Sequence, residues 1–389
     1  MTYDVTAPAA DSATPATPVP ARLVFLWNNF GPMHADRIEA VARRFPQSEL
    51  HGIEMYDRDV TYDWTGDEAP RFRKTTLFAV AETPGRLRRI SRFLCVAWRL
   101  RRAHWFMCHY ERPEVLAAAI LLRLCGAQVF TMGCSKFDDK DRSARGEWLK
   151  SFALAPYRGA IGTQERSTDY FRFLGLPRVA SPYNTLSVDR MRAQAADVPR
   201  PAFADRPWTI VARLVGKKNL SMALSAFALY RAGGGHRALH LCGNGPLERT
   251  LKAQADALGI ADAVTFHGFV QTAQISRILA GSLALILPSI EEQFGNVVIE
   301  AQALDLPVLI SDRCGARELL VQDWVNGFSF PHDRPESLAG YMALLDGDEA
   351  LCARLATGAR ASAPRGDVAA FAEAVATLVA PETLPEPAV

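Results

Sequence analysis

The 389-residue sequence lacks several features that mark specialised classes of protein. Its seven cysteines show no C-x-x-C spacing, which argues against a zinc site or a disulfide scaffold and for reduced thiols. No apolar run reaches the length of a membrane span, and the best, residues 115–122, ends at Arg123. The first twenty residues have neither the basic start nor the apolar core of a secretory signal. We therefore expect a cytoplasmic protein.

The chain also has little net charge, +2, but the charge is unevenly spread. Residues 1–200 hold 29 lysines and arginines against 22 acids, whereas residues 201–389 hold 15 against 20. This asymmetry indicates that the first half faces something anionic. The alternative is a chance distribution of surface charge.

The pattern of apolar runs and turn residues predicts an α/β protein with two doubly wound domains. The first domain is expected over residues 21–196 and the second over residues 208–365. They are joined by a linker, residues 197–207, that is rich in proline and small residues. Residues 1–20 and 381–389 have the composition of disordered tails.

The most informative stretch covers residues 283–330, which alternate between strand and helix. A strand over 283–287 leads into a polar loop and then a helix that opens at Gly295 and Asn296. The helix is apolar almost all round, so Glu300 inside it is an unusual buried carboxylate. Glu292 lies in the loop, where open α/β sheets bind ligands, and the helix N-terminus favours an anion. The pattern favours a phosphorylated, hydroxyl-rich ligand such as a nucleotide sugar.

Cations stand at an earlier strand end of the same domain. Arg213 follows a strand over residues 208–212, and Lys217 and Lys218 open the next helix, where positive charge opposes the helix dipole. Arg213 and Lys218 can converge on a diphosphate. The later G-x-G loop at Gly243 resembles the start of a dinucleotide fingerprint, but Glu248 occupies the third glycine position.

The first half offers less specific signals. The loop at Gly31, between a strand over 23–27 and a helix from Met33, either approaches a phosphate or is an ordinary turn. His109 ends a strand over 104–110, and it either takes part in the reaction or has a structural role. The loop over 134–143 carries polar residues that could meet a polar substrate: Ser135, Lys136 and Asp138.

Two further motifs have open interpretations. The D-x-D triplets at residues 57–59 and 139–141 resemble metal-holding triplets of some glycosyltransferases, or they occur by chance. Residues 86–102 hold seven arginines and an apolar stripe at helical spacing, which includes Leu87 and Trp98. Such a helix either lies in an anionic membrane surface or packs on the sheet with solvated arginines.

Four motifs in order carry a family resemblance: VARLVGKKNL, HLCGNGPLE, FHGFV and EEQFGNVVIEAQALDLPVLISD. With its E-x7-E pair, the second half resembles glycosyltransferase family 4, the group 1 glycosyltransferases. The first half is similar mainly in architecture. The first loop departs from the family's usual Gly-Gly pair by having Phe30-Gly31-Pro32, and Leu304-Asp305 replaces a common small residue and glycine.

The resemblance implies a GT-B fold, with the active site between two Rossmann-like domains and a final helix, residues 366–380, packed back on the first domain. It implies a nucleotide-diphospho-sugar donor, transfer with retention, no cofactor and no divalent metal. By the resemblance, Arg213 and Lys218 bind the diphosphate and Glu292 binds the sugar. Glu300 binds the ribose, the base lies near Val270, and the Phe294-Gly295-Asn296 backbone contacts the sugar or a phosphate. In the first half, Gly31 contacts the donor, and catalysis takes place near His109.

The E-Q-F-G-N form is similar to transferases of bacterial surface polysaccharide assembly. A lipid-linked saccharide acceptor is then expected, with a membrane surface reached through residues 86–102 at the inner face of the plasma membrane, and no nucleic-acid partner. The alternatives are a GT-B nucleotide-sugar 2-epimerase and a non-catalytic membrane-surface binding module.

Overall fold

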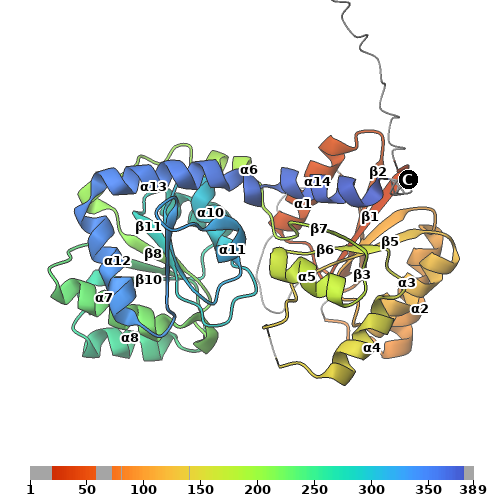
Figure 1. The fold of residues 1–389 in the computed structure, drawn as a ribbon, viewed down its shortest axis with the longest axis horizontal. Coiled ribbons are helices and arrows are strands. Elements are labelled where there is room, and N and C mark those ends of the chain that lie inside the picture. Colours follow the sequence, from red (N-terminus) through yellow and green to blue (C-terminus); the bar gives the residue numbers. More distant parts are fainter. Residues whose placement is uncertain (1–19, 58–71, 80, 140, 381–389) are drawn as a thin grey trace, which may run out of the picture.

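The computed structural model describes residues 20–57, 72–79, 81–139 and 141–380. They form two lobes, each built on a parallel sheet between layers of helices (Figure 1). None of the helices described is long and apolar enough to cross a bilayer.

The first lobe contains a seven-stranded sheet in the order β3-β2-β1-β4-β5-β6-β7. Its strands are β1 (Arg22–Trp27), β2 (Glu49–Tyr56), β3 (Arg73–Phe78), β4 (His104–Met107), β5 (Gln128–Met132), β6 (Gly159–Ile161) and β7 (Arg178–Ala180). Its helices are α1 (Pro32–Arg44), α2 (Arg86–Arg99), α3 (Pro113–Leu124), α4 (Ala144–Leu154) and α5 (Glu165–Phe173). Helices α2, α3 and α5 cover one face of the sheet, and α1 covers the other.

The second lobe contains a six-stranded sheet in the order β10-β9-β8-β11-β12-β13. Its strands are β8 (Trp208–Val211), β9 (Leu239–Cys242), β10 (Val264–Gly268), β11 (Ala284–Leu287), β12 (Val308–Ser311) and β13 (Gly327–Phe330). Its helices are α7 (Leu220–Ala232), α8 (Glu248–Ala257), α9 (Thr272–Ala280), α10 (Val297–Ala303), α11 (Ala316–Leu320), α12 (Pro335–Gly347) and α13 (Glu349–Ser362).

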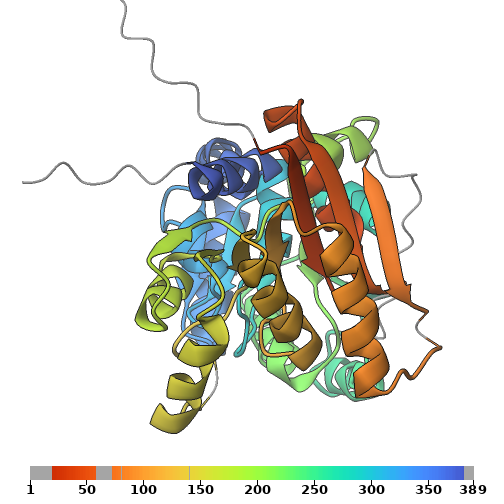
Figure 2. The ribbon, with the colours of Figure 1, turned by 90° about the vertical axis from the view of Figure 1, so that its right-hand side faces the viewer.

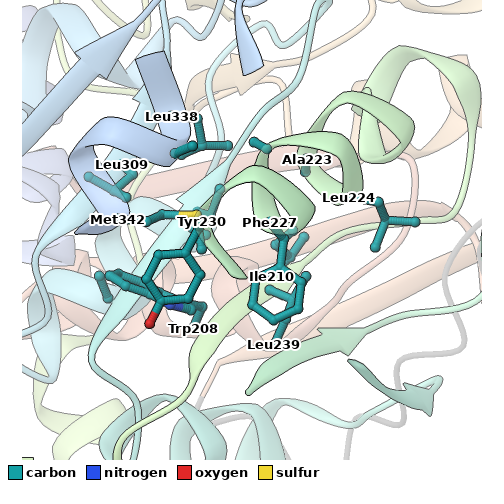
Figure 3. Close-up of a cluster of buried hydrophobic side chains, with 14 of the residues drawn as sticks. Trp208, Ile210, Ala223, Leu224, Phe227, Tyr230, Leu239, Leu309, Leu338 and Met342 are labelled. Atoms are coloured by element: carbon teal, nitrogen blue, oxygen red, sulfur yellow. The ribbon is translucent and has the colours of Figure 1, made fainter. Parts of the chain in front are cut away.

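Helices bury both faces of the second sheet, which explains why its inner strands read as continuous apolar runs. Every residue of β11 and β12 is buried. Figure 3 shows the core on one face, where Trp208 of β8 packs edge-on against Tyr230 of α7, with ring centroids 5.8 Å apart. Leu338 and Met342 of α12 close this cluster. The core fixes the strand ends that carry the site.

The strand order reverses beside β1 in the first sheet and beside β8 in the second. Open α/β sheets bind ligands outside the carboxyl ends of the strands at such reversal points. Here the loops that follow β1, β8 and β11 line one cavity, so the two reversal points open toward each other. The topology alone therefore places a site between the lobes.

The chain crosses between the lobes twice, and the two crossings are hydrogen-bonded to each other. The Leu186 N–H donates to the Gly366 carbonyl (3.1 Å), and the Val368 N–H donates to the Leu186 carbonyl (3.2 Å). Helix α6 (Val188–Gln194) packs on α9 and α10 of the second lobe. The first crossing therefore comes before α6 and not in residues 197–207, which corrects the expected boundary at 196.

The second crossing leads into α14 (Val368–Val379), which returns to the first lobe (Figure 1). Phe371 and Val375 join the core between β1 and α1, and Arg44 of α1 pairs with Glu373 at 2.7 Å. A helix from the end of the chain thus completes the core of the domain at its beginning.

The sequence pattern missed β2, β3 and α6, and it misplaced parts of α2. Only Phe93 and Ala97 are buried on α2, while Leu87 (82 % exposed) and Trp98 (52 %), expected in the apolar stripe, face solvent. Lys217 and Lys218 lie in a 3₁₀ turn, Gly216–Lys218, before α7 rather than in its first turn. Of the first D-x-D triplet, Arg58 and Asp59 lie outside the described residues.

Two glycines within helices of the second lobe give a matched test of this packing. A Cβ on Gly358 of α13 would stand 1.9 Å from the Val325 carbonyl oxygen, whereas a Cβ on Gly340 of α12 would meet nothing within 4 Å. We expect Gly358→Ala to lower the free energy of unfolding by at least about 2 kcal/mol, because backbone must move. Gly340→Ala should raise it by about 0.5–1 kcal/mol through helix propensity. Urea denaturation measures both, and equal effects would contradict the packing described.

Candidate active site between the two lobes

A cavity of about 610 Å³ lies between the carboxyl ends of the two sheets. The first lobe contributes the loop after β1, including Gly31 and His34, together with Cys134 and Asn184. The second lobe contributes the strand ends and loops after β8, β9, β10 and β11. Every residue expected on the donor side lines this cavity: Gly31, Arg213, Lys218, Val270, Glu292, Phe294, Gly295, Asn296 and Glu300.

An ion pair between Lys218 and Glu292 holds two of these loops together. Both side chains are about 15 % exposed, and the Ser289 hydroxyl also donates to Glu292 (3.3 Å). The Ile290 N–H donates to the Lys217 carbonyl (3.0 Å), so the backbones of the loops are joined as well. A cation and an acid are therefore assembled on the cavity wall before any ligand arrives.

Two glycines make this close approach of loops feasible. Gly243 (φ +141°) follows β9, and a Cβ there would stand 2.0 Å from the Ala212 carbonyl oxygen, in the segment that carries Arg213. Gly295 (φ +108°) precedes α10, and a Cβ there would stand 2.8 Å from Leu287. Both need the left-handed or extended positive-φ backbone that glycine adopts readily. The close approach of the Ala212 backbone therefore explains why Gly243 of the G-x-G loop is a glycine, without a dinucleotide fingerprint.

The segment before α10 offers backbone donors. The hydrogen bonds of this helical turn begin at Val298, whose N–H donates to the Gly295 carbonyl (3.0 Å). Within the described chain, the N–H groups of Gly295, Asn296 and Val297 have no acceptor, and all three residues line the cavity. Together with Arg213 and Lys218, they provide donors suited to an anion.

Glu300 lies on α10, 8 % exposed, at the cavity wall. Burial raises the pKa of its carboxyl to about 7, although the charge of Arg190 acts in the opposite direction. Arg190 is itself held by Asp36 of α1 (2.6 Å). Among the described residues, no group donates a hydrogen bond to the Glu300 carboxyl. A buried carboxyl without a protein donor, facing a cavity, is suited to accept hydrogen bonds from ligand hydroxyls.

His34 is a lining residue that the sequence did not indicate. Its Nδ1 accepts a hydrogen bond from the Gly31 N–H (3.0 Å), so the neutral ring carries its proton on Nε2. Burial, with the nearby charges of Arg37 and His109, holds the pKa of His34 well below its usual value. Gly31 thus lines the cavity, but its N–H is already engaged. A histidine in the first turn of a helix after a glycine loop was the available signal.

His109 does not line the cavity. It follows β4 with a left-handed backbone (φ 64°), and its Nδ1 lies 3.4 Å from Oε1 of Glu111. Such a backbone is uncommon for a residue with a side chain. His109 stands two residues beyond the end of β4, and its charge helps to lower the pKa of His34, which lines the cavity.

The three residues expected on the acceptor side also lie outside the lining. Lys136 is buried, with Nζ 3.7 Å from Asp138. Asp138 pairs with Arg166, which also pairs with Glu318 of the second lobe. Asp139, of the second D-x-D triplet, pairs with Arg142. The loop with Ser135 thus joins the lobes at the rim of the cavity.

Asn184 is another lining residue that the sequence did not indicate. Its side-chain amide donates to the Asn296 side chain (2.9 Å) across the lobes, and Thr163 donates to it in turn (2.9 Å). The Asn296 side chain is therefore engaged in an interlobe contact, while its backbone remains at the cavity. No local sequence pattern distinguishes such an asparagine from one in an ordinary loop.

The burial of Glu300 predicts a pH-dependent effect on stability. Its pKa is about 7 in the folded protein against an ordinary 4.5, so folding without ligand is disfavoured increasingly as pH rises from 4.5 to 7. Glu300→Gln removes the ionisable group. The variant should gain stability over the wild type, up to about 3 kcal/mol above pH 7, with the gain vanishing near pH 4.5. Urea denaturation across this range measures it, and a pH-independent difference would contradict the assignment.

Comparison with known proteins agrees with this geometry. Residues 205–362 match the family model of glycosyl transferases group 1. The amylovoran biosynthesis glycosyltransferase AmsK of Erwinia amylovora is 31 % identical over 157 residues, which cover 39 % of this chain and 38 % of AmsK. The putative colanic acid biosynthesis glycosyltransferase WcaL of Escherichia coli K12 is 29 % identical over 187 residues, 45 % of each chain. The matches thus span less than half the length of these two relatives.

The likeness in structure extends over both lobes. Anabaena HepE, solved in complex with UDP and glucose, superposes with a TM-score of 0.69 at 18 % identity and covers 92 % of this chain and 98 % of its own. At this identity the likeness concerns the fold, and it confirms the α/β class expected from the sequence. The chain therefore has the GT-B fold, and its second lobe is similar in sequence to the group 1 glycosyl transferases.

Proposed function

We propose that the protein transfers a glycosyl group from a nucleotide-diphospho-sugar to a glycan or lipid-linked saccharide, with retention of configuration, in bacterial exopolysaccharide or O-antigen synthesis. The observation that carries this proposal is the grouping of Arg213, Lys218, Glu292 and Glu300 around one cavity between the lobes. The polysaccharide-related names of AmsK and WcaL support the biological context.

The donor would be bound by groups of opposite character. Arg213, Lys218 and the free N–H groups of residues 295–297 face the diphosphate, whose charge they balance. Glu300 accepts hydrogen bonds from the ribose, and Glu292 accepts them from the sugar. The base lies near Val270, which is 6 % exposed. The UDP and glucose held by HepE support this class of donor.

The same groups would assist the chemistry. As the glycosidic bond breaks, negative charge develops on the leaving diphosphate, and a preorganised lysine and arginine stabilise it where it forms. The sugar passes through an oxocarbenium-like state. Because these cations come from side chains already in place, we propose that transfer requires no divalent metal and no cofactor.

Retention is supported by the shortage of a suitable base. Inversion needs a group that removes the acceptor proton on the face opposite the leaving group. Of the described residues that line the cavity, the carboxylates are Glu292, which is paired with Lys218, and Glu300, which is buried in α10. His34 presents a protonated Nε2. We therefore propose attack from the leaving-group face, with the departing phosphate accepting the proton.

The acceptor would enter past the loop over residues 134–143. Ser135, Lys136 and Asp138 follow Cys134, which lines the cavity, and we propose that they contact the acceptor and that His109 assists catalysis. A lipid-linked saccharide would bring the protein to the inner face of the plasma membrane. The arginines of residues 86–102 support this location, since five of these seven side chains are exposed.

Neighbouring lysines offer a matched test of the donor site. Lys218 faces the cavity and pairs with Glu292, whereas Lys217 is 42 % exposed in its side chain and lies 3.7 Å from Glu291. Lys218→Ala should lower kcat/KM for transfer by roughly 100-fold or more, because it removes charge stabilisation and leaves Glu292 unpaired. Lys217→Ala should leave it nearly unchanged. A thermal-shift screen of UDP-, GDP- and dTDP-sugars first identifies the donor, and transfer from that donor is then measured. Equal activity of the two variants would refute the assigned donor site.

The stereochemical outcome is tested by following the reaction by NMR in the presence of EDTA. The glycosidic product should keep the anomeric configuration of the donor, and chelation should leave the rate unchanged. An inverted product would refute the proposed mechanism, and complete loss of rate would indicate a metal. Conversion of the donor sugar without an acceptor would instead identify a 2-epimerase.

A further inference from the structure

A second cavity, of about 180 Å³, lies in the first lobe at the amino ends of the strands. His104 and Gln128 line it, and they begin the strands β4 and β5, where they pair directly. Arg178, which begins β7, pairs with Gly159, the residue after Arg158, and both arginines line the cavity. The cavity shares no lining residue with the one between the lobes, which lies at the opposite, carboxyl ends of the strands.

The last turn of α14 forms another wall of this cavity. Leu378 and Ala380 line it, and Nη2 of Arg178 donates to the carbonyls of Thr377 and Ala380 (2.9 Å each). Arg178 therefore satisfies carbonyls at the C-terminal end of the helix. Figures 1 and 2 both show α14 (dark blue) beside the short strands β6 and β7. A ligand in the cavity would thus touch both the sheet and the helix that returns from the second lobe.

The charged groups around the cavity are positive in the described chain. Arg158 and Arg178 line it, and the charge of Arg158 also reaches Arg123 of α3. Burial, together with the charge of Arg158, lowers the pKa of His104 and that of Arg123. Within the described residues, none of the three arginines forms an ion pair with a carboxylate. Like charges gathered without an acid oppose folding, and a bound anion would remove that cost.

Arg158 has an unsatisfied donor inside this cluster. Its backbone N–H donates to the Val129 carbonyl (2.7 Å), which fixes the start of β6, but its side-chain Nε–H is buried without an acceptor in the described chain. Buried polar groups of native proteins are normally hydrogen-bonded, and a charged donor left without an acceptor is especially costly. Phe130 and Leu378, each about 1 % exposed, supply an apolar part of the lining. The cavity therefore combines anion donors with room for carbon.

We propose that this cavity binds the phosphate group of a small phosphate ester. The planar guanidinium groups of Arg158 and Arg178 match phosphate oxygens in geometry and charge, and the Gln128 side-chain amide offers a further donor. The apolar part of the lining contacts the carbon chain of the ester. At about 180 Å³ the cavity is small for a ligand site, so it fits an ester of few carbons. The inference does not depend on the proposed transfer reaction.

Calorimetric titration with glycerol 3-phosphate tests the site in the full chain bearing Lys218→Ala, which weakens anion binding between the lobes. This protein should bind the ester and should not bind glycerol. Adding Arg158→Met should weaken binding by roughly 10- to 100-fold, because charge-assisted hydrogen bonds are lost. Adding Arg145→Met instead is the matched control, since Arg145 of α4 is exposed, lies outside the cavity and has no ionic partner in the described chain.

An absence of binding, or equal weakening by the two arginine variants, would overturn the proposal. Binding that appears only after Glu382 and Glu386 are replaced by glutamine would do so too. These acids follow Ala380 in the sequence, and that result would mean that the chain's own carboxylates fill the site.

Thermal melting of the same proteins separates a ligand site from a structural arginine. Without ligand, Arg158→Met should raise the melting temperature by roughly 2–4 °C, because it removes a buried donor without an acceptor and relieves repulsion with Arg123. Glycerol 3-phosphate should raise the melting temperature of the parent by mass action and leave that of the variant unchanged. A lower melting temperature of the variant without ligand would identify Arg158 as structural and overturn the proposal.

Discussion

The ion pair between Lys218 and Glu292 joins loops from β8 and β11, the strands that flank the point of reversal in the second sheet. Parallel pairing brings their carboxyl ends side by side, so residues 74 positions apart can meet on one wall. The pair leaves each partner with spare hydrogen-bonding capacity toward the cavity: ammonium donors for phosphate and carboxylate acceptors for hydroxyls. The rest of the site is arranged around it, because Gly243 and Gly295 have the backbone conformations that let the neighbouring loops approach this closely.

Glu300 shows how the site conflicts with stability. A carboxyl 8 % exposed in an otherwise apolar helix has no protein donor in the described chain, and its pKa of about 7 reflects the loss of water. Arg190 compensates only in part, since Asp36 already holds it. Arg190 of α6 and Asp36 of α1 lie at the contact between these two helices, where the lobes meet. A ligand hydroxyl would supply the missing donor, so ligand binding and interlobe contact bear on the same carboxyl.

The second lobe was predictable from sequence because its inner strands β11 and β12 are buried on both faces and site residues follow shortly after strands, as Arg213 does after β8. The first lobe was less so. β3 begins Arg-Lys-Thr-Thr and carries no apolar run, and β2 is interrupted by Gly52, so tertiary pairing rather than pattern decides them. Asn184 reaches the cavity through long-range packing, which no local signal reveals, whereas His34 stands in the first turn of the helix that follows the Gly31 loop. The same limit applies to α4: spacing shows that it is amphipathic, but only the hydrogen bond that Glu147 accepts from Tyr170 shows which side is buried.

The loop over residues 134–143 connects these two aspects of the first lobe. It begins at Cys134, which lines the cavity, and ends at Ser143, whose hydroxyl caps α4 by accepting from the Gly146 N–H (3.2 Å). Along its length it is held to the second lobe, through Gln293 to Asp139 (3.4 Å) and through Asp138, Arg166 and Glu318. Helix α4 is therefore tied through one short segment to the edge of the cavity.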